Sequence, residues 1–96
     1  MFQSMIKMFN CRDTEALFNG KRVVRFVNFE RAALRKLVQL DLAQIIEDMR
    51  APPGNRLELL KGDRAGQWSV RINDQWRLCF RFEDGNALDV EITDYH

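Results

Sequence analysis

The sequence predicts an α+β fold in which helices pack on one face of an antiparallel sheet. Three observations support this class. Apolar residues recur at helical spacing up to about residue 50, they recur at every second position from Arg56 onward, and turn-forming pairs separate the later apolar runs. Since the helices precede the strands along the chain, the two kinds of element are expected to form separate layers.

The chain has the length and composition of one globular domain. It has 96 residues, of which 46% are hydrophobic and 30% are charged, and we expect a single domain over 1–96. Residues 1–4 are interpreted as a non-essential N-terminal extension, with Met5 as an alternative start. No apolar run approaches the ~20 residues that span a bilayer, and no secretory signal is present. We therefore expect a cytoplasmic protein with no membrane partner.

The first half of the chain carries the helical patterns. Alternation over 5–10 predicts a short first strand, and Asp13 or Thr14 can cap a short helix that ends at Gly20. Asn28 is the predicted N-cap of a longer helix. That helix has an apolar stripe of Phe29, Ala33, Leu37 and Leu40 and a second stripe of Arg31, Arg35 and Gln39.

A further helical segment is predicted after the long helix. Asp41 can cap it, the apolar residues up to Met49 follow helical spacing, and the sequence Pro52-Pro53-Gly54-Asn55 ends all helix.

Four strands are predicted in the second half. Their inward residues alternate with polar ones: Leu57 and Leu59; Trp68, Val70 and Ile72; Trp76, Leu78, Phe80 and Phe82; Leu88, Val90 and Ile92. Asn73-Asp74 and Asp84-Gly85 suit tight hairpins, so the last three strands should form an antiparallel meander. The tryptophans and phenylalanines of these strands are interpreted as core.

The opposite parity of the same strands gathers polar groups on one surface. The set includes Gln67, Ser69, Arg71 and Asn73, then Arg77, Cys79 and Arg81, then Glu91, Thr93 and Tyr95. Cross-strand ion pairing explains part of it, but exposed pairs contribute only ~0–1 kcal/mol. Stability alone is therefore a weak reason to collect so many charges there.

Charge is also concentrated between residues 21 and 36, which hold six Lys or Arg residues and one acid, Glu30. Such a stretch can meet phosphates or an acidic partner, or it can be a solvated helix face. The formal net charge is only +1, which argues against strong non-specific nucleic-acid binding. Any RNA binding is expected to be local.

Two further segments carry residues suited to chemistry. The loop Lys61–Gly66 has two glycines that permit close backbone approach to a ligand, although it is also consistent with a flexible turn. The chain closes on Asp94-Tyr95-His96, which includes its single histidine. Imidazole transfers protons near neutral pH, but terminal residues are often only surface residues. Cys11 and Cys79 form no CxxC pair, which argues against a metal enzyme.

Taken together, the segments LKGDRAGQWS, NDQWRL and DYH resemble the HigB branch of the RelE-like bacterial toxins, over residues 5–96. The resemblance implies a RelE-like fold, a twisted antiparallel sheet with two to three N-terminal helices packed on one face. It implies a toxin of a type II toxin–antitoxin system, a ribosome-dependent and metal-independent endoribonuclease that cleaves messenger RNA in the decoding site. The implied partners are the small ribosomal subunit, messenger RNA and a HigA-like helix-turn-helix antitoxin, through which alone the protein would contact operator DNA. No cofactor is implied.

The resemblance also implies a site. Lys61, Arg77, Asp94, Tyr95 and His96 correspond to the family's catalytic residues. Lys61 and Arg77 would hold the phosphate, His96 would transfer protons as acid or base with Asp94 orienting it, and Tyr95 would stack on a base or donate a proton. The arginines expected to bind RNA are Arg64, Arg71, Arg31 and Arg35, the last two also serving ribosome docking.

One structural condition applies to the C-terminal residues. Strand parity puts Asp94 and His96 on the apolar side, so we expect the last strand to twist or break near Thr93. A regular strand there would weaken the proposed site.

Two other functions remain open. The first is a catalytically weak or inactive toxin-like subunit that mainly binds the antitoxin in transcriptional autoregulation. The second is a free-standing single-stranded RNA-binding domain, which is disfavoured because the aromatic side chains have core parity instead of forming an exposed stacking surface.

Overall fold

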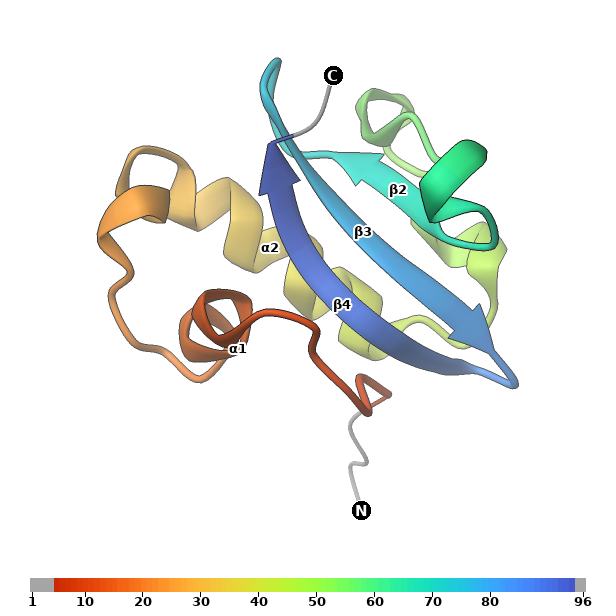
Figure 1. Ribbon diagram of the computed structural model, residues 1–96, viewed down its shortest axis with the longest axis horizontal. Helices are drawn as coiled ribbons and strands as arrows, with labels where there is room; N and C mark the ends of the chain where they lie inside the picture. The colour runs from red at the N-terminus through yellow and green to blue at the C-terminus, as the bar shows by residue number, and fades with distance from the viewer. Residues whose placement is uncertain (1–4, 95–96) are drawn as a thin grey trace.

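The computed structural model describes residues 5–94 as two layers, a four-stranded antiparallel sheet and a helical layer behind it (Figure 1). The strands lie in the order β1-β2-β3-β4, which is also their order along the chain. The strands are β1 (Glu58–Leu59), β2 (Trp68–Arg71), β3 (Trp76–Glu83) and β4 (Asn86–Asp94), and the α-helices are α1 (Arg12–Phe18) and α2 (Glu30–Leu42). The predicted α+β class and the predicted meander are confirmed.

The connections within residues 5–94 contain four short 3-10 helices. They are η1 (Val24–Phe29), η2 (Ile46–Met49), η3 (Pro53–Asn55) and η4 (Gly62–Arg64). The further helical segment predicted up to Met49 is confirmed as η2, a single 3-10 turn that ends where it was expected to end. Asp48 Oδ2 accepts hydrogen bonds from the amides of Gln44 (2.9 Å) and Ile45 (3.2 Å). These local bonds favour a single turn over continuation of α2.

Both predicted helix starts are displaced. Helix α1 begins at Arg12, so Asp13 and Thr14 lie inside it and do not cap it. Thr14 is fully buried, and its Oγ1 accepts a hydrogen bond from the amide of Ile92 in β4 (2.9 Å). Helix α2 begins at Glu30, because the predicted cap Asn28 belongs to η1.

The N-terminal segment lies along the outer edge of β4 without forming a regular strand. Two isolated parallel bridges, Ile6 with Ala87 and Phe9 with Val90, replace the predicted strand over 5–10. Asp41 has a different role from the predicted helix cap, because its Oδ1 accepts hydrogen bonds from the amides of Met5 (3.0 Å) and Ile6 (3.2 Å). The β4 edge is thereby covered, which protects backbone groups that would otherwise invite pairing with another chain.

The core lies between α2 and the sheet. Ala33, Leu37 and Leu40 of α2 are fully buried. The sheet meets them with Val70, Leu78, Phe80, Val90 and Ile92. Trp68 and Trp76 are partly buried against this core, as predicted. None of the helices in the described part of the chain is long and apolar enough to cross a membrane.

A β-bulge changes the parity of β4. Two residues of β4, Asp89 and Val90, lie opposite Phe80 between the pairs Arg81–Leu88 and Cys79–Glu91. Asp89 takes a left-handed backbone conformation with φ 52°, as bulged residues often do. Ala87 is buried in place of Leu88, and the prediction that Leu88 points inward is wrong. The inward prediction for Leu59 is also wrong, since 54% of this residue is exposed at the sheet edge.

Candidate functional site

The sheet face opposite α2 is polar, and no α-helix of residues 5–94 covers it (Figure 1). The strand register aligns Glu58, Ser69, Cys79 and Glu91 in one row across all four strands. A neighbouring row contains Arg71, Arg77 and Thr93. The predicted polar surface therefore exists, and the ladder register brings its members together from distant parts of the sequence.

Arg77 lies in the centre of this surface. Its Nη1 is 3.6 Å from Oε1 of Glu58 and 3.5 Å from Oγ of Ser69. The guanidinium therefore reaches from β3 across β2 toward β1. About a quarter of the side chain is exposed (26%), so Arg77 stays accessible to an anion.

Arg64 reaches the same surface from η4. Its Nη1 donates hydrogen bonds to Oε1 of Gln67 (3.0 Å) and to Oε1 of Glu91 in β4 (3.2 Å). The 3-10 turn makes this reach possible, because the Ala65 amide donates to the Gly62 carbonyl (3.0 Å) and returns the chain toward β2. Gly62 has φ 69°, a value that glycine adopts without steric cost.

A pocket of about 470 Å³ adjoins this network at the β1 edge of the sheet. It is lined by Glu58, Leu59, Leu60, Lys61, Asp63 and Arg64. Lys61 and Arg64 thus share a pocket with Glu58, and Glu58 is the residue that pairs with Arg77. Three cations predicted from the sequence thus lie at this edge of the sheet, with Arg77 paired to Glu58, Arg64 paired to Glu91, and Lys61 lining the pocket.

Cys79 is buried beneath the charged groups of this surface, and its thiol is unreactive at neutral pH. Burial raises the pKa of its thiol to about 11, opposed by the positive charges of Arg64 and Arg77. Glu91 and Glu58 raise the pKa further. The thiol stays protonated at neutral pH and is a poor nucleophile.

Arg71 belongs to the same face but is engaged locally. Its Nη2 pairs with Asp74, and its Nε donates to the Asn73 carbonyl (3.2 Å), both in the turn between β2 and β3. Arg31 and Arg35 are exposed on α2, in the layer behind the sheet. The four arginines expected to bind RNA are thus divided between opposite sides of the sheet.

The last strand does not break at Thr93. Thr93 pairs with Arg77 and Asp94 pairs with Trp76 in regular antiparallel register, so the expectation of a break is wrong. Asp94 Oδ2 accepts a hydrogen bond from Nε2 of Gln75 (2.8 Å), which places the carboxylate beside the turn between β2 and β3. Tyr95 and His96 lie outside the described residues. Within residues 5–94, no three His, Cys, Asp or Glu side chains gather as a metal-binding group.

Glu58 is a site residue that sequence reasoning missed. The predicted first strand contributes Leu57 and Leu59 to the core face, and no role is predicted for Glu58 between them. Its parity was nevertheless a usable signal, because a residue between Leu57 and Leu59 points away from the predicted core face. Its pairing with Arg77, nineteen residues later in the chain, follows only from the register of β1, β2 and β3.

Comparison with known proteins gives consistent results. Residues 14–96 match a family model described as the RelE-like toxin of the type II toxin–antitoxin system HigB. Toxin HigB-1 of Vibrio cholerae is 50% identical over 63 residues, 66% of this chain and 66% of that protein. Endoribonuclease HigB of Proteus vulgaris is 44% identical over 41 residues, 43% of this chain and 45% of that protein. The matched stretches thus span about two thirds or less of these relatives.

Solved structures share the fold. The YoeB-YefM complex from Staphylococcus aureus contains a chain that superimposes with a TM-score of 0.55 at 19% identity, over 95% of this chain and 97% of that one. A YoeB/ParE toxin from Agrobacterium tumefaciens gives a TM-score of 0.50 at 20% identity, over 95% and 99%. These matches, together with the antiparallel sheet and its helical layer, identify the RelE-like α+β fold.

Proposed function

Because the chain belongs to the HigB-like toxin family of type II toxin–antitoxin systems, we propose that it is an endoribonuclease that cleaves messenger RNA on the ribosome. The observation that carries this proposal is the cationic edge of the polar sheet face, where Arg77 contacts Glu58 and where Lys61 and Arg64 line the adjoining pocket. The name of the Proteus relative, Endoribonuclease HigB, supports the same activity.

The reaction needs a cationic surface more than it needs a nucleophile from the protein. In metal-independent cleavage the 2′-hydroxyl of RNA attacks the adjacent phosphorus, a P–O2′ bond forms, and the P–O5′ bond breaks. Negative charge accumulates on the phosphorane oxygens, and fixed cations stabilise it. In our proposal Lys61 and Arg77 hold the scissile phosphate, and Arg64 and Arg71 hold neighbouring phosphates.

Two proton transfers complete the reaction. We propose that Glu58, which pairs with Arg77, accepts the 2′-hydroxyl proton when a phosphate binds to Arg77. His96 then donates a proton to the departing 5′-oxygen. We further propose that Asp94 orients His96 and that Tyr95 stacks on a base. This assigns His96 the role of acid, which the sequence alone left open.

The setting of the reaction follows from its substrate. We propose that the uncovered sheet face enters the decoding site of the small ribosomal subunit, so the protein acts in the cytoplasm. A HigA-like helix-turn-helix antitoxin would hold it inactive, and operator DNA would be contacted through that antitoxin. The low net charge of +1 agrees with docking through a local cationic surface.

The test is induced expression without antitoxin, for wild type and His96→Ala, with 5′-end mapping of a reporter messenger RNA. His96→Ala should reduce the cleavage rate ~10²- to 10⁴-fold, the usual contribution of a general acid or base. Its thermal midpoint should equal that of wild type. Cuts confined to translated regions would support ribosome dependence. Soluble wild-type protein that neither cuts nor arrests growth would instead indicate a subunit that only binds the antitoxin.

A further inference from the structure

The solvent-facing side of α2 has an unusual composition. The helix buries Ala33, Leu37 and Leu40, and its opposite side carries Arg31 and Arg35 in the first half and Val38 and Leu42 in the second. Val38 is 43% exposed, Leu42 is 51% exposed, and Ile45 just beyond the helix is 57% exposed. A helix that only faces water normally carries polar residues on that side. Val38 and Leu42 continue the line of Arg31 and Arg35 along the helix, and such a combination of exposed apolar and basic residues suits contact with another molecule.

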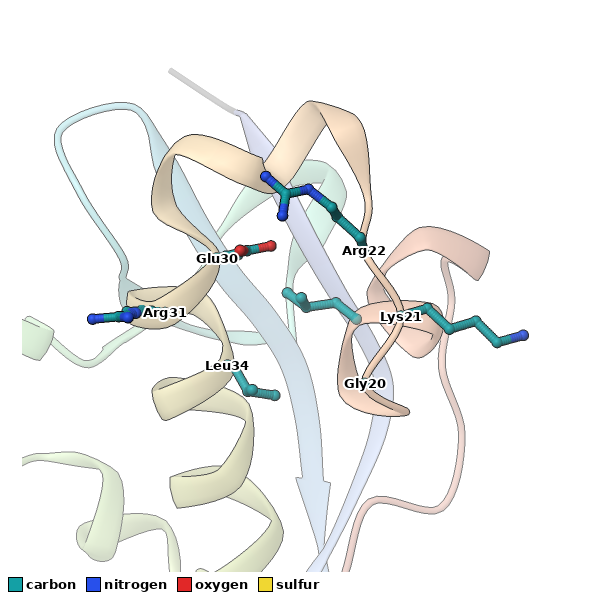
Figure 2. Close-up of a pocket in the computed structure, with 7 residues that line it drawn as sticks. Gly20, Lys21, Arg22, Glu30, Arg31 and Leu34 are labelled. Atoms are coloured by element: carbon teal, nitrogen blue, oxygen red, sulfur yellow. The ribbon is translucent and has the colours of Figure 1, made fainter.

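A pocket of about 330 Å³ adjoins the first half of this side, between α2 and the segment 20–22 that follows α1. Leu17, which is 3% exposed, and Leu34 form its apolar part. Figure 2 shows Leu34 pointing into the gap and Arg22 on its rim, while Lys21 and Arg31 extend outward on either side. The pocket thus has an apolar interior and a rim on which three cations, Lys21, Arg22 and Arg31, outnumber one acid, Glu30.

We propose that this surface binds an amphipathic segment of the antitoxin, a proposal that rests on the proposed function. We call it the α2 surface and define it as Arg22, Arg31, Leu34, Arg35, Val38 and Leu42. Apolar side chains of the partner would cover Leu34, Val38 and Leu42, and carboxylates beside them would meet the three arginines. The choice of an acidic partner follows from charge complementarity, because residues 21–36 hold six cations and one acid.

The composition of the surface favours this occupant over RNA. RNA-binding surfaces combine cations with exposed aromatic rings that stack on bases. The large exposed hydrophobic residues in the described chain are aliphatic, and two of them, Val38 and Leu42, lie one turn apart on this side of α2. Burying aliphatic side chains against another protein lowers the free energy, because apolar surface is removed from water. Contact with phosphates gives no such stabilisation.

A second copy of the chain is also a poor occupant. In a two-fold symmetric contact the same patch meets itself. Arg31 and Arg35 of one copy would then approach the same arginines of the other, and juxtaposed like charges oppose association. An acidic segment removes this repulsion.

The experiment uses three variants of the full chain. Val38→Glu tests the apolar half, Arg31→Glu with Arg35→Glu tests the basic half, and Lys7→Glu with Met8→Glu is the matched control on the exposed N-terminal segment. The probe is the purified antitoxin encoded beside the gene for this chain. Its Kd is measured by titration calorimetry, and association with 70S ribosomes is measured by sedimentation. Thermal midpoints establish that each variant is folded.

The α2 surface variants should each weaken antitoxin binding by roughly tenfold or more, the scale of a central interface contact. The control should bind as wild type does, and all variants should retain ribosome association. Unchanged antitoxin binding with weakened ribosome association would overturn the proposal and assign the surface to RNA. Wild-type protein that binds no antitoxin would overturn it as well. Cleavage assays on the same proteins test the proposed nuclease activity independently. The ratio of the antitoxin Kd of a variant to that of wild type does not depend on catalysis, so either proposal can fail without the other.

Discussion

At the scale of single residues, the proposed site depends on where each charge is held. Glu58 is two strands away from Arg77 in the sheet, yet the two side chains meet 3.6 Å apart. The contact holds the guanidinium over the open face before substrate arrives, which lowers the cost of organising the site during the reaction. The same contact gives Glu58 a position from which it can accept a proton. Glu58 is therefore the residue whose substitution is most informative.

Glu58→Gln should reduce single-turnover cleavage of messenger RNA on programmed ribosomes about 10²-fold or more, because glutamine keeps the size and the contact with Arg77 but cannot accept a proton. The matched control is Glu83→Gln, an exposed glutamate that also pairs with an arginine, Arg81. The control should cleave at the wild-type rate. A wild-type rate in Glu58→Gln would mean that the proton acceptor is another group.

Cys79 gives a prediction about stability and pH. The unfolded thiol has a pKa near 9.0, and burial raises the folded value to about 11. Between about pH 9 and pH 11 the thiol is therefore protonated in the folded chain and ionised in the unfolded chain. The free energy of unfolding falls as the pH rises through this range. The free energy of unfolding should fall by roughly 2 kcal/mol between about pH 8 and pH 10.5 relative to Cys79→Ala, measured by urea denaturation. Parallel pH profiles for the two proteins would contradict a raised thiol pKa.

At the scale of elements, the outer edge of β4 is covered by the segment that precedes α1 and by the first turn of α1. The segment before α1 exchanges backbone hydrogen bonds with this edge, among them Lys7 N–H to the Ala87 carbonyl (2.9 Å) and Asn10 N–H to the Val90 carbonyl (3.0 Å). Thr14 of α1 continues the series by accepting from the Ile92 amide. Helix α1 is thus fixed to the strand that leads to the C-terminal residues of the proposed site.

Thr14→Val should lower the free energy of unfolding by about 1–3 kcal/mol, because it removes the acceptor and leaves the buried Ile92 N–H without that partner. Thr14→Ser keeps the hydroxyl and should lose only about 0.8 kcal/mol for the missing methyl group. Chemical denaturation measures both. Equal losses in the two variants would show that packing, and not the hydrogen bond, is what Thr14 contributes.

At the scale of the whole molecule, the two faces have different roles in our proposals. Lys61, Arg64, Arg71 and Arg77 belong to the sheet side and its β1 edge, whereas Arg31 and Arg35 lie on α2 behind it. Ribosome docking should then depend on the first group. Antitoxin binding should depend on the second.

Ribosome association should weaken with salt, with a slope of log K against log salt of roughly −3 if four sheet-side cations each neutralise one phosphate. Replacing Arg64 and Arg71 by alanine should reduce that slope to about half. Replacing Arg31 and Arg35 by alanine should leave it unchanged. Sedimentation at several salt concentrations measures the slopes, and a reduced slope in the α2 variant would place RNA contacts on the helix side.

The sequence-based predictions were accurate where a regular pattern of apolar residues decides which face of an element is buried. They were inaccurate where one residue interrupts the regular backbone. The strand alternation of Trp76, Leu78, Phe80 and Phe82 was read correctly because period-2 patterning reflects which face is buried. Leu88 was misassigned because a single left-handed residue, Asp89, inverts the parity of the strand before it. The turn predicted up to Met49 is present as η2, but its cap is Asp48 and not the predicted Asp41. The roles predicted for Tyr95 and His96 fall outside the described residues and stay predictions.

The sequence by itself determined the α+β class, the core face of the main strands, the cationic character of the opposite face and the family. The first three properties follow from residue type and periodicity, which are local, and the family follows from the resemblance of the LKGDRAGQWS, NDQWRL and DYH segments. Only the tertiary structure decided that Glu58 faces Arg77, that Arg64 spans to Glu91, and that Arg31 and Arg35 lie behind the sheet. Strand register and layer packing set those positions, because they join residues far apart in the chain through contacts that no local pattern encodes.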